Sequence, residues 1–143
     1  MIRTILVAVD DSDGSRRAAD FAHDLALQTG AHLTLLLCIE PPGMVPFGAL
    51  DSFLMAPQQP SPERVDRTRV LMAEQLKALP PERVDTRVET GPAAEVICTT
   101  AEAISADLIV LGARGTSSLG RWLLGSVSER VLRHAGRPVT VVH

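Results

Sequence analysis

Residues 2–14 read IRTILVAVDDSDG, and this stretch decides the fold. Its first part, Ile2–Val9, is a nearly continuous apolar run rich in β-branched side chains, which is typical of a strand buried on both faces of a parallel sheet. Asp10–Gly14 then ends the strand with turn-forming and helix-capping residues. A helical pattern follows from Ser15 to Thr29, and Gly30 is a typical helix stop. The opening of the chain therefore predicts a strand followed by a helix.

The alternation of strand-like and helix-like segments continues to the end of the chain. Further strands are predicted at His32–Ile39, Val84–Glu89, Leu108–Leu111 and Pro138–Val142, and further helices at Ser61–Leu79, Gly91–Ser105 and Val127–Ala135. This order predicts the α/β class, with an open, twisted, mostly parallel five-stranded sheet and four helices on its two faces. Ligands bind such sheets at the carboxyl ends of the strands, where the winding direction reverses. The turns after the first and fourth strands are therefore the expected functional positions.

The chain has 143 residues, which suits a single domain that spans residues 1–143. Residues 41–60 contain half of its ten prolines and form a loop that is long for a compact domain. The segments on either side are too small to fold alone, so this loop is not a domain boundary. It is predicted to be a lid over a site, a cover for a subunit interface, or a plain surface loop.

The charges and the rare residue types exclude several functions. The formal net charge is −3 and Lys77 is the only lysine, which argues against a nucleic-acid surface and excludes a Walker-type phosphate loop. The four histidines are scattered, and Cys38 and Cys98 lie far apart in the sequence, so no metal site made by protein ligands is predicted. The two cysteines form either one disulfide or two free thiols, and free thiols in a reducing cytosol are the favoured interpretation.

Targeting segments and catalytic motifs are also missing from the sequence. No apolar run is long enough to span a bilayer and no signal peptide precedes the first strand, so a soluble, cytoplasmic protein is predicted. The sequence contains neither a G-x-S-x-G elbow nor a G-x-G-x-x-G dinucleotide fingerprint. No catalytic residues are therefore predicted.

The turn after the fourth predicted strand carries the strongest functional signal. It runs from Gly112 to Ser126 and reads GARGTSSLGRWLLGS. Its last glycine and serine precede a helix, and the free N–H groups and dipole of a helix start form an anion site. Hydroxyl and guanidinium groups in and beside the turn add donors and positive charge, and they belong to Arg114, Ser117, Ser118, Arg121, Ser126 and Ser128. This segment predicts a phosphate cradle that contains no lysine.

Each of these residues also has a purely structural interpretation, and the sequence leaves it open. Ser126 and Glu129 have the spacing of a capping box, in which both side chains only close the start of the helix. Arg114 and Arg121 are equally typical of solvated surface charges, and Trp122 is typical of packing. Glycines after a strand are common in turns, so it is the combination at this point of the fold that favours phosphate binding.

The spacing Gly112-x2-Gly115-x9-Gly125-Ser126 resembles the ATP-binding signature of the universal stress protein family. The resemblance covers essentially the whole chain, since further segments are similar to the family's strands and last helix. They are Ile5–Asp10 with Ser12, Leu33–Pro41, Asp107–Gly112, Leu124–Val131 and Pro138–Val139. The resemblance implies a Rossmann-like fold of the adenine-nucleotide alpha-hydrolase-like type, which binds ATP with Mg²⁺ or Mn²⁺.

The resemblance also implies which residues form the nucleotide site. They are Ala8, Val9, Asp10, Cys38, Leu111, Gly112, Ala113, Arg114, Gly115, Gly125, Ser126, Val127 and Ser128. Asp10 would contact the ribose or a phosphate-bound metal ion, and its alternative role is a turn or capping carboxylate. The backbone of Cys38 would hydrogen-bond the adenine edge, and its alternative role is a small buried apolar side chain. Arg114 departs from the family pattern, so it either holds phosphate or faces water.

The function that the resemblance implies is a small cytoplasmic ATP-binding regulator of the stress response. It also implies a homodimer formed through the last strand, Pro138–Val142, which is predicted at an edge of the sheet. Two alternatives remain at this level. One is a dimeric interaction module that binds no nucleotide, and the other is a weak ATPase. Because no general base is recognisable, ATP hydrolysis is expected to be slow or absent.

Overall fold

The computed structural model describes residues 1–40, 62–113 and 124–143. The elements are β1 (Thr4–Ala8), α1 (Asp13–Thr29), β2 (His32–Ile39), α2 (Pro62–Ala78), η2 (Pro81–Arg83), β3 (Val84–Thr90), α3 (Ala93–Ala103), β4 (Leu108–Gly112), α4 (Ser126–His134) and β5 (Val139–Val142). The predicted order of strands and helices is confirmed. The start of α1 lies two residues earlier than predicted, because Ser12 is its N-cap and accepts the N–H of Ser15.

The five strands form one sheet in the order β3-β2-β1-β4-β5, and all the pairings described are parallel. The predicted fold class is therefore confirmed. The chain builds the sheet outward from β1 through β2 to β3, then crosses back to add β4 and β5 on the other side of β1. The winding direction thus reverses between β1 and β4, and the carboxyl ends of these two strands are the expected place for a ligand.

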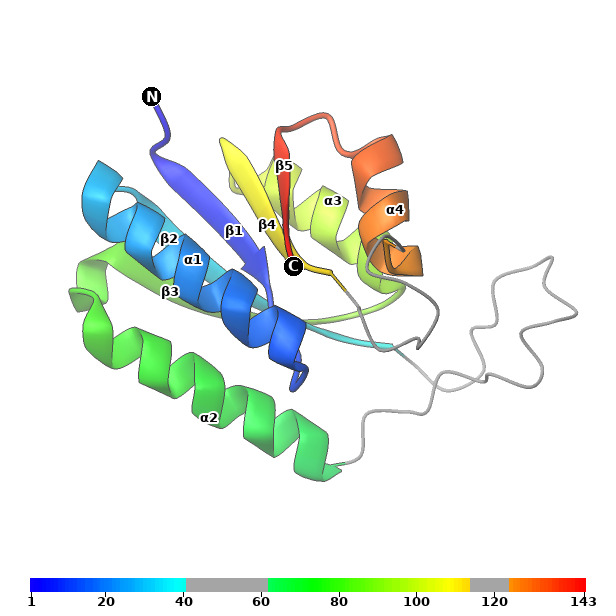
Figure 1. Ribbon diagram of the computed structural model, residues 1–143, viewed down its shortest axis with the longest axis horizontal. Coiled ribbons are helices and arrows are strands. Elements are labelled where there is room, and N and C mark those ends of the chain that lie inside the picture. Colours follow the sequence, from blue (N-terminus) through cyan, green and yellow to red (C-terminus); the bar gives the residue numbers. More distant parts are fainter. Residues whose placement is uncertain (41–61, 114–123) are drawn as a thin grey trace, which may run out of the picture.

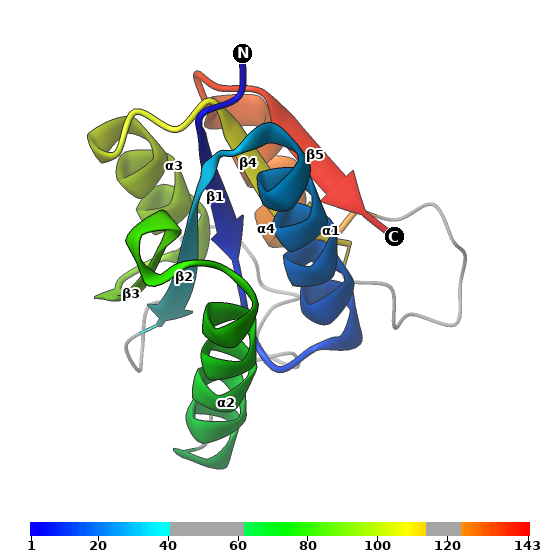
Figure 2. The same ribbon diagram turned by 90° about the vertical axis from the view of Figure 1, so that its left-hand side faces the viewer.

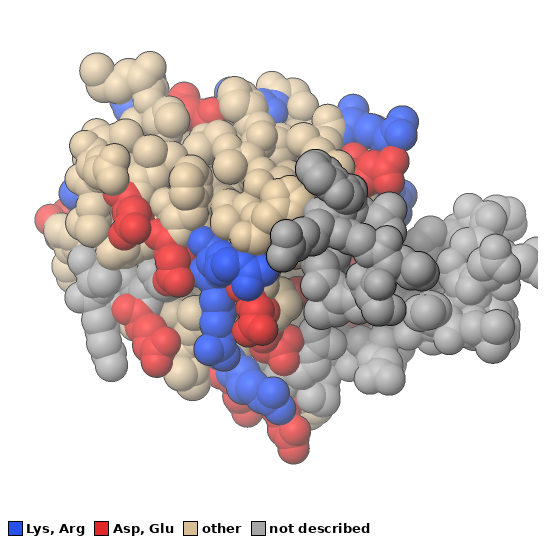
Figure 3. Space-filling model, in the orientation of Figure 1, with Lys and Arg blue, Asp and Glu red and all other residues tan. Residues whose placement is uncertain are grey.

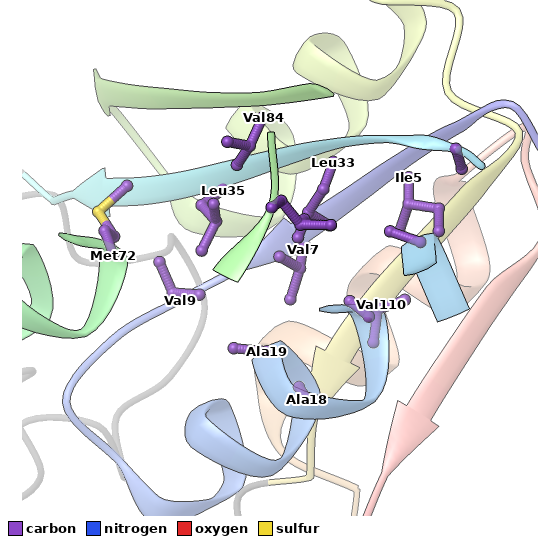
Figure 4. Packing of buried hydrophobic residues seen from close by; sticks show 14 of the residues in the cluster. Ile5, Val7, Val9, Ala18, Ala19, Leu33, Leu35, Met72, Val84 and Val110 are labelled. Carbon is purple, nitrogen blue, oxygen red and sulfur yellow. The ribbon is translucent and has the colours of Figure 1, made fainter. Parts of the chain in front are cut away.

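Helices cover both faces of the sheet (Figures 1 and 2). One face carries α1 and α2 and the other carries α3 and α4, so the buried residues form two separate clusters. In β1 the side chains alternate between them: Ile5 and Val7, with Val9 just after the strand, join the cluster under α1, and Leu6 joins the cluster under α3 and α4. Figure 4 shows the first cluster, in which small alanines of α1 face the strands. These small side chains let α1 lie close to the sheet.

The ends of α1 are fixed by different kinds of interaction. At its carboxyl end Gly30 adopts a left-handed conformation, with φ of 76°, and its N–H bonds the carbonyl of Ala26. Arg83, from η2, donates to the carbonyls of Ala26 and Ala31. Gly30 confirms the predicted helix stop, whereas the contribution of Arg83 comes from a distant part of the chain.

No helix in the described ranges is both long and apolar enough to cross a membrane.

Candidate functional site

β1 and β4 separate at the carboxyl edge of the sheet. Their registered pairing ends at Val7 and Val110, although both strands continue beyond these residues. Past this point the N–H of Asp10 donates to the hydroxyl of Ser15, at 2.7 Å, instead of to a strand partner. The registered pairing thus ends at the place where the winding direction reverses, and we call this end of the pairing the opening between β1 and β4.

Gly112 ends β4 and lies directly against the first turn of α1. A Cβ atom at Gly112 would lie 2.5 Å from the carbonyl oxygen of Gly14 and 2.7 Å from the nitrogen of Ser15. A Cβ atom at Gly14 would in turn lie 2.6 Å from the carbonyl oxygen of Ala113. Contacts under 3.0 Å exclude any side chain, so both glycines are required by the close approach of two main-chain segments.

Asp10 lies in the turn between β1 and α1. Its Oδ1 accepts the N–H of Ser12 at 2.8 Å, and Ser12 then caps α1 through the N–H of Ser15 at 3.2 Å. Of the two structural roles considered for Asp10, the turn carboxylate is therefore observed and the helix cap belongs to Ser12. The turn places Asp10 shortly after the end of β1, and its contact with ribose or a bound metal ion stays a prediction.

Cys38 lies near the end of β2. The Leu36 carbonyl accepts the N–H of Val9 at 2.9 Å, so the peptide groups of Leu36 face β1. Peptide groups alternate in direction along a strand, so those of Cys38 also face the β1 side, beyond the last registered pair, Ala8 and Leu36. This orientation directs the Cys38 backbone toward the side of β1, past the end of that strand, and its hydrogen bond to an adenine edge stays a prediction.

The side chain of Cys38 has a different environment from its backbone. The thiol is partly buried and lies 4.0 Å from the carbonyl oxygen of Ala93. Burial, followed by the negative charges of Glu40 and Glu89, raises the pKa of the Cys38 thiol to about 12. The thiol is therefore neutral near pH 7. Cys38 and Cys98 are both free, which confirms the interpretation favoured from the sequence.

Among the helices that start at the carboxyl edge, the starts of α1, α3 and α4 are completed differently. Ser12 caps α1, and the Glu40 carboxylate accepts the N–H of Ala93, the first residue of α3, at 3.2 Å. The N-cap of α4 is Gly125, which is extended, and no side chain of the described residues caps this helix by a hydrogen bond. Of these three helix starts, α4 alone lacks a capping side chain, so its first N–H groups are the ones placed to bind an anion.

The capping-box interpretation of Ser126 and Glu129 is wrong. Ser126 is the first helical residue rather than the cap, because Gly125 takes the N-cap position and accepts the N–H of Glu129 at 2.9 Å. The Glu129 carboxylate instead pairs with Arg133 at 2.9 Å, one turn further along α4. Ser126 is exposed, and its hydroxyl and N–H group lie at the open start of the helix.

Ser128 has a role that the sequence did not indicate. Its hydroxyl donates to the carbonyl of Gly112 at 3.2 Å, and only 4% of the residue is exposed. That hydroxyl proton is therefore used inside the protein, and it is not available to a phosphate oxygen as the sequence suggested. The hydrogen bond joins the first turn of α4 to the end of β4.

The predicted site residues fall into three groups. Those at the carboxyl edge near the opening are Ala8, Asp10, Cys38, Gly112, Gly125, Ser126, Val127 and Ser128. Val9, Leu111 and Ala113 are also at this edge, but at most 5% of each is exposed, so only their backbones are placed to face a ligand. Arg114 and Gly115, with the other loop residues up to Leu123, lie outside the described residues.

Two residues of this region were missed from the sequence. Ser15 bonds the N–H of Asp10, and Glu40 caps α3 from a position 53 residues away. The spacing of Ser12 and Ser15 after a strand is a visible signal for the first. Nothing local to Glu40 or Ala93 indicates the second, since their meeting depends on the pairing of β2 with β3.

The face made by α1 and α2 mixes positive and negative side chains, and its arginines lie among acidic side chains (Figure 3). Arg67 lies 4.0 Å from a carboxylate oxygen of Asp11 and 3.7 Å from one of Glu63, and Arg69 lies 3.8 Å from Asp66. These positive charges are already balanced. Within the described ranges, no group of three or more His, Cys, Asp or Glu residues is placed to hold a metal ion.

Known proteins resemble this chain over nearly its whole length. The family model described as "Universal stress protein family" matches residues 1–143, the full length of the sequence. The chain belongs to the universal stress protein family. A relative from Thermus aquaticus, described as "Universal stress protein in QAH/OAS sulfhydrylase 3'region", is 35% identical over 142 residues, which are 99% of each chain.

Solved structures of other members have the same fold. A universal stress protein in complex with cAMP superposes with a TM-score of 0.68 and 24% identity, over 99% of this chain and 97% of that one. The universal stress protein from Archaeoglobus fulgidus in complex with dAMP gives a TM-score of 0.67 and 22% identity, over all of both chains. At these identities the likeness establishes the fold.

Proposed function

We propose that this protein binds an adenine nucleotide, ATP with Mg²⁺ or Mn²⁺, in the opening between β1 and β4. The observation that carries the proposal is the start of α4: within the described ranges, Gly125 leaves the helix without a capping side chain, on the carboxyl side of the sheet where the pairing of β1 with β4 ends. A helix start of this kind attracts phosphate through its free N–H groups and its dipole. The complexes of related family members with cAMP and dAMP support an adenine nucleotide.

Different residues bind different parts of the nucleotide. The peptide groups of Cys38 face the adenine edge, and the Asp10 carboxylate is directed to the ribose or to a metal ion held by the phosphates. The N–H groups of Ser126, Val127 and Ser128, with the Ser126 hydroxyl, receive the phosphate tail. Arg114 and Gly115 are assigned to the phosphates by the family resemblance alone.

The biological role that fits is a small cytoplasmic regulator of the stress response, which acts as a homodimer. β5 is an edge strand, and its pairing with β4 uses the carbonyls of Pro138 and Val142. The peptide groups of Val139 and Val141 therefore face away from the sheet and are placed to pair with β5 of a second copy. Nucleotide binding would then alter a surface that a dimer presents to its partners.

The test of nucleotide binding uses the first residue of α4. Ser126→Pro removes one N–H group, and proline is well tolerated at this position because its fixed φ suits the helix start. Ser126→Ala is the matched control, since it removes the hydroxyl but keeps the N–H group. We expect calorimetry with MgATP to show binding by the native protein and at least a tenfold weaker affinity in Ser126→Pro. We expect a smaller loss in Ser126→Ala.

The same titrations separate the alternatives. If the native protein releases no heat with MgATP and its melting temperature does not rise, the nucleotide-free interaction module is the better description. If it releases phosphate over many turnovers and Asp10→Ala abolishes the release, the weak ATPase is the better description. If Ser126→Pro and Ser126→Ala bind ATP as tightly as the native protein, the phosphates do not lie on α4.

A further inference from the structure

The hydrogen-bond ladder between β1 and β4 stops at a defined point. The pairing of Val7 with Val110 directs the N–H of Ala8 to the carbonyl of Val110. Adding two residues on each strand gives the next bond of a continued ladder, from the N–H of Asp10 to the carbonyl of Gly112. These two groups are complementary, one a donor and the other an acceptor.

Each of these two groups is bonded to a serine hydroxyl instead. The N–H of Asp10 donates to Ser15 Oγ at 2.7 Å, and the Gly112 carbonyl accepts from Ser128 Oγ at 3.2 Å. The serines come from α1 and α4, which cover opposite faces of the sheet. Both are 4% exposed, so neither hydroxyl is a general surface contact.

We propose that Ser15 and Ser128 are positioning residues that hold the opening between β1 and β4 apart. Each hydroxyl takes one half of the hydrogen bond that would otherwise continue the ladder and close the strands together. Asp10 and Gly112 are half-buried, and main-chain groups that are shielded from water are normally paired, so the two buried serines supply partners at the point where the ladder ends. The opening is thus maintained by side chains that need not touch the ligand.

The packing around Gly112 explains why these contacts control the site. The main chain of Gly14 and Ser15 lies against Gly112 on one side, within 2.7 Å of where a Cβ atom would be. Ser128 bonds its carbonyl from α4, on the other side of the sheet. A change at either serine therefore acts on the end of β4 and on the start of a helix at the same time.

The first experiment measures stability and needs no ligand. Ser15→Ala and Ser128→Ala each leave one half-buried main-chain group without its serine partner, so each is expected to lower the melting temperature. In the double variant the Asp10 N–H and the Gly112 carbonyl both lose their serine partners, and these two groups are then able to hydrogen-bond each other. We expect the melting temperature of the double variant to fall clearly less than the sum of the two single decreases. We also expect the Asp10 N–H to exchange its hydrogen more slowly in the double variant than in Ser15→Ala. Strictly additive losses would overturn the proposal.

The second experiment measures binding and rests on the proposed nucleotide function. In the double variant the opening closes, so calorimetry should show at least a tenfold loss of affinity for MgATP and also for adenosine. Ser128→Thr retains a hydroxyl at position 128, so this variant should retain the affinity for MgATP. Thr100→Ala removes a buried hydroxyl on α3, two turns from the edge, and should change stability without changing affinity.

The outcomes of the two experiments are distinguishable. A double variant that binds both ligands like the native protein would overturn the positioning role, whatever its stability. If the native protein binds neither MgATP nor adenosine, the proposed function fails. The stability measurements then still decide whether the two serines interrupt the ladder.

Discussion

Gly112 is the residue at which the parts of the site meet. The main chain of α1 lies against it on one face of the sheet, and the hydroxyl of Ser128 bonds its carbonyl. The sequence marks Gly112 as the first glycine of a nucleotide-binding spacing. It does not show that the group close to this glycine is the main chain of Gly14, because the two residues are 98 positions apart.

Gly112→Ala should therefore lower stability and nucleotide binding together. The added methyl group would collide with main chain, which cannot move aside as a flexible side chain would, so we expect a loss of about 2–3 kcal/mol in the free energy of unfolding. Gly136→Ala is the control, because a Cβ atom at Gly136 meets nothing within 4 Å. Its effect should stay within about 0.5 kcal/mol. Urea unfolding measures both, and equal effects would contradict the packing described for Gly112.

Cys38 should react slowly with thiol reagents at neutral pH. Its pKa of about 12 means that it loses its proton only as the pH rises toward 12, whereas an ordinary cysteine does so near 8.5. At pH 8 the reactive thiolate is then roughly a thousandfold rarer than in an unfolded chain. Iodoacetamide labelling of Cys98→Ser, followed by mass spectrometry in native buffer and in urea, measures this difference. Labelling of Cys38 at equal rates in both conditions would contradict its burial.

The ends of the helices are where elements from distant parts of the chain meet. Gly30 and Ser12 close α1 from within its own sequence neighbourhood, and the sequence indicates both. The cap of α3 comes from Glu40, and the carboxyl end of α1 is held by Arg83. Neither interaction leaves a local pattern, since both depend on the position of β2 between its neighbours.

Arg83→Met should destabilise the molecule without altering the site. The substitution keeps an unbranched apolar side chain but removes the donors to the carbonyls of Ala26 and Ala31. It also removes a positive charge from the carboxyl end of α1, where the helix dipole favours one. We expect a loss of about 1–3 kcal/mol by urea unfolding, with MgATP affinity unchanged. Arg87→Met, on exposed β3, is the control and should have little effect; a comparable loss there would show that general charge, not the contact, is responsible.

At the scale of the whole molecule, the free edge of β5 predicts how two copies meet. The carbonyls of Pro138 and Val142 accept hydrogen bonds from β4. Because peptide groups alternate in direction along a strand, those of Thr140 also face β4, whereas those of Val141 face outward. Val141→Pro should therefore prevent pairing between subunits and leave the sheet intact. Thr140→Pro should instead break the bonds to β4 and destabilise the protein itself.

Sedimentation velocity combined with thermal unfolding separates these two outcomes. The native protein is expected to sediment as a dimer and Val141→Pro as a monomer. The melting temperature of Val141→Pro should fall only by the amount that dimerisation contributes. Thr140→Pro should show the lower melting temperature even at high dilution. A Val141→Pro protein that remains dimeric would exclude β5 as the interface.

The amino-acid sequence by itself determined the order of the elements and the class of fold, because burial of a parallel strand and the periodicity of a helix are properties of consecutive residues. It also predicted the turns at Asp10 and Gly112 and the helix start after Gly125, since turn and helix-start chemistry is local. Only the tertiary structure decided which serine hydroxyls form hydrogen bonds inside the protein. Ser126 is exposed, whereas the Ser128 hydroxyl donates to the Gly112 carbonyl. Likewise, Ser15 and Glu40 joined the region only through contacts made when the strands came together. Hydrogen-bond partners distant in sequence are fixed by the packing of the sheet and its helices, and no local pattern records them.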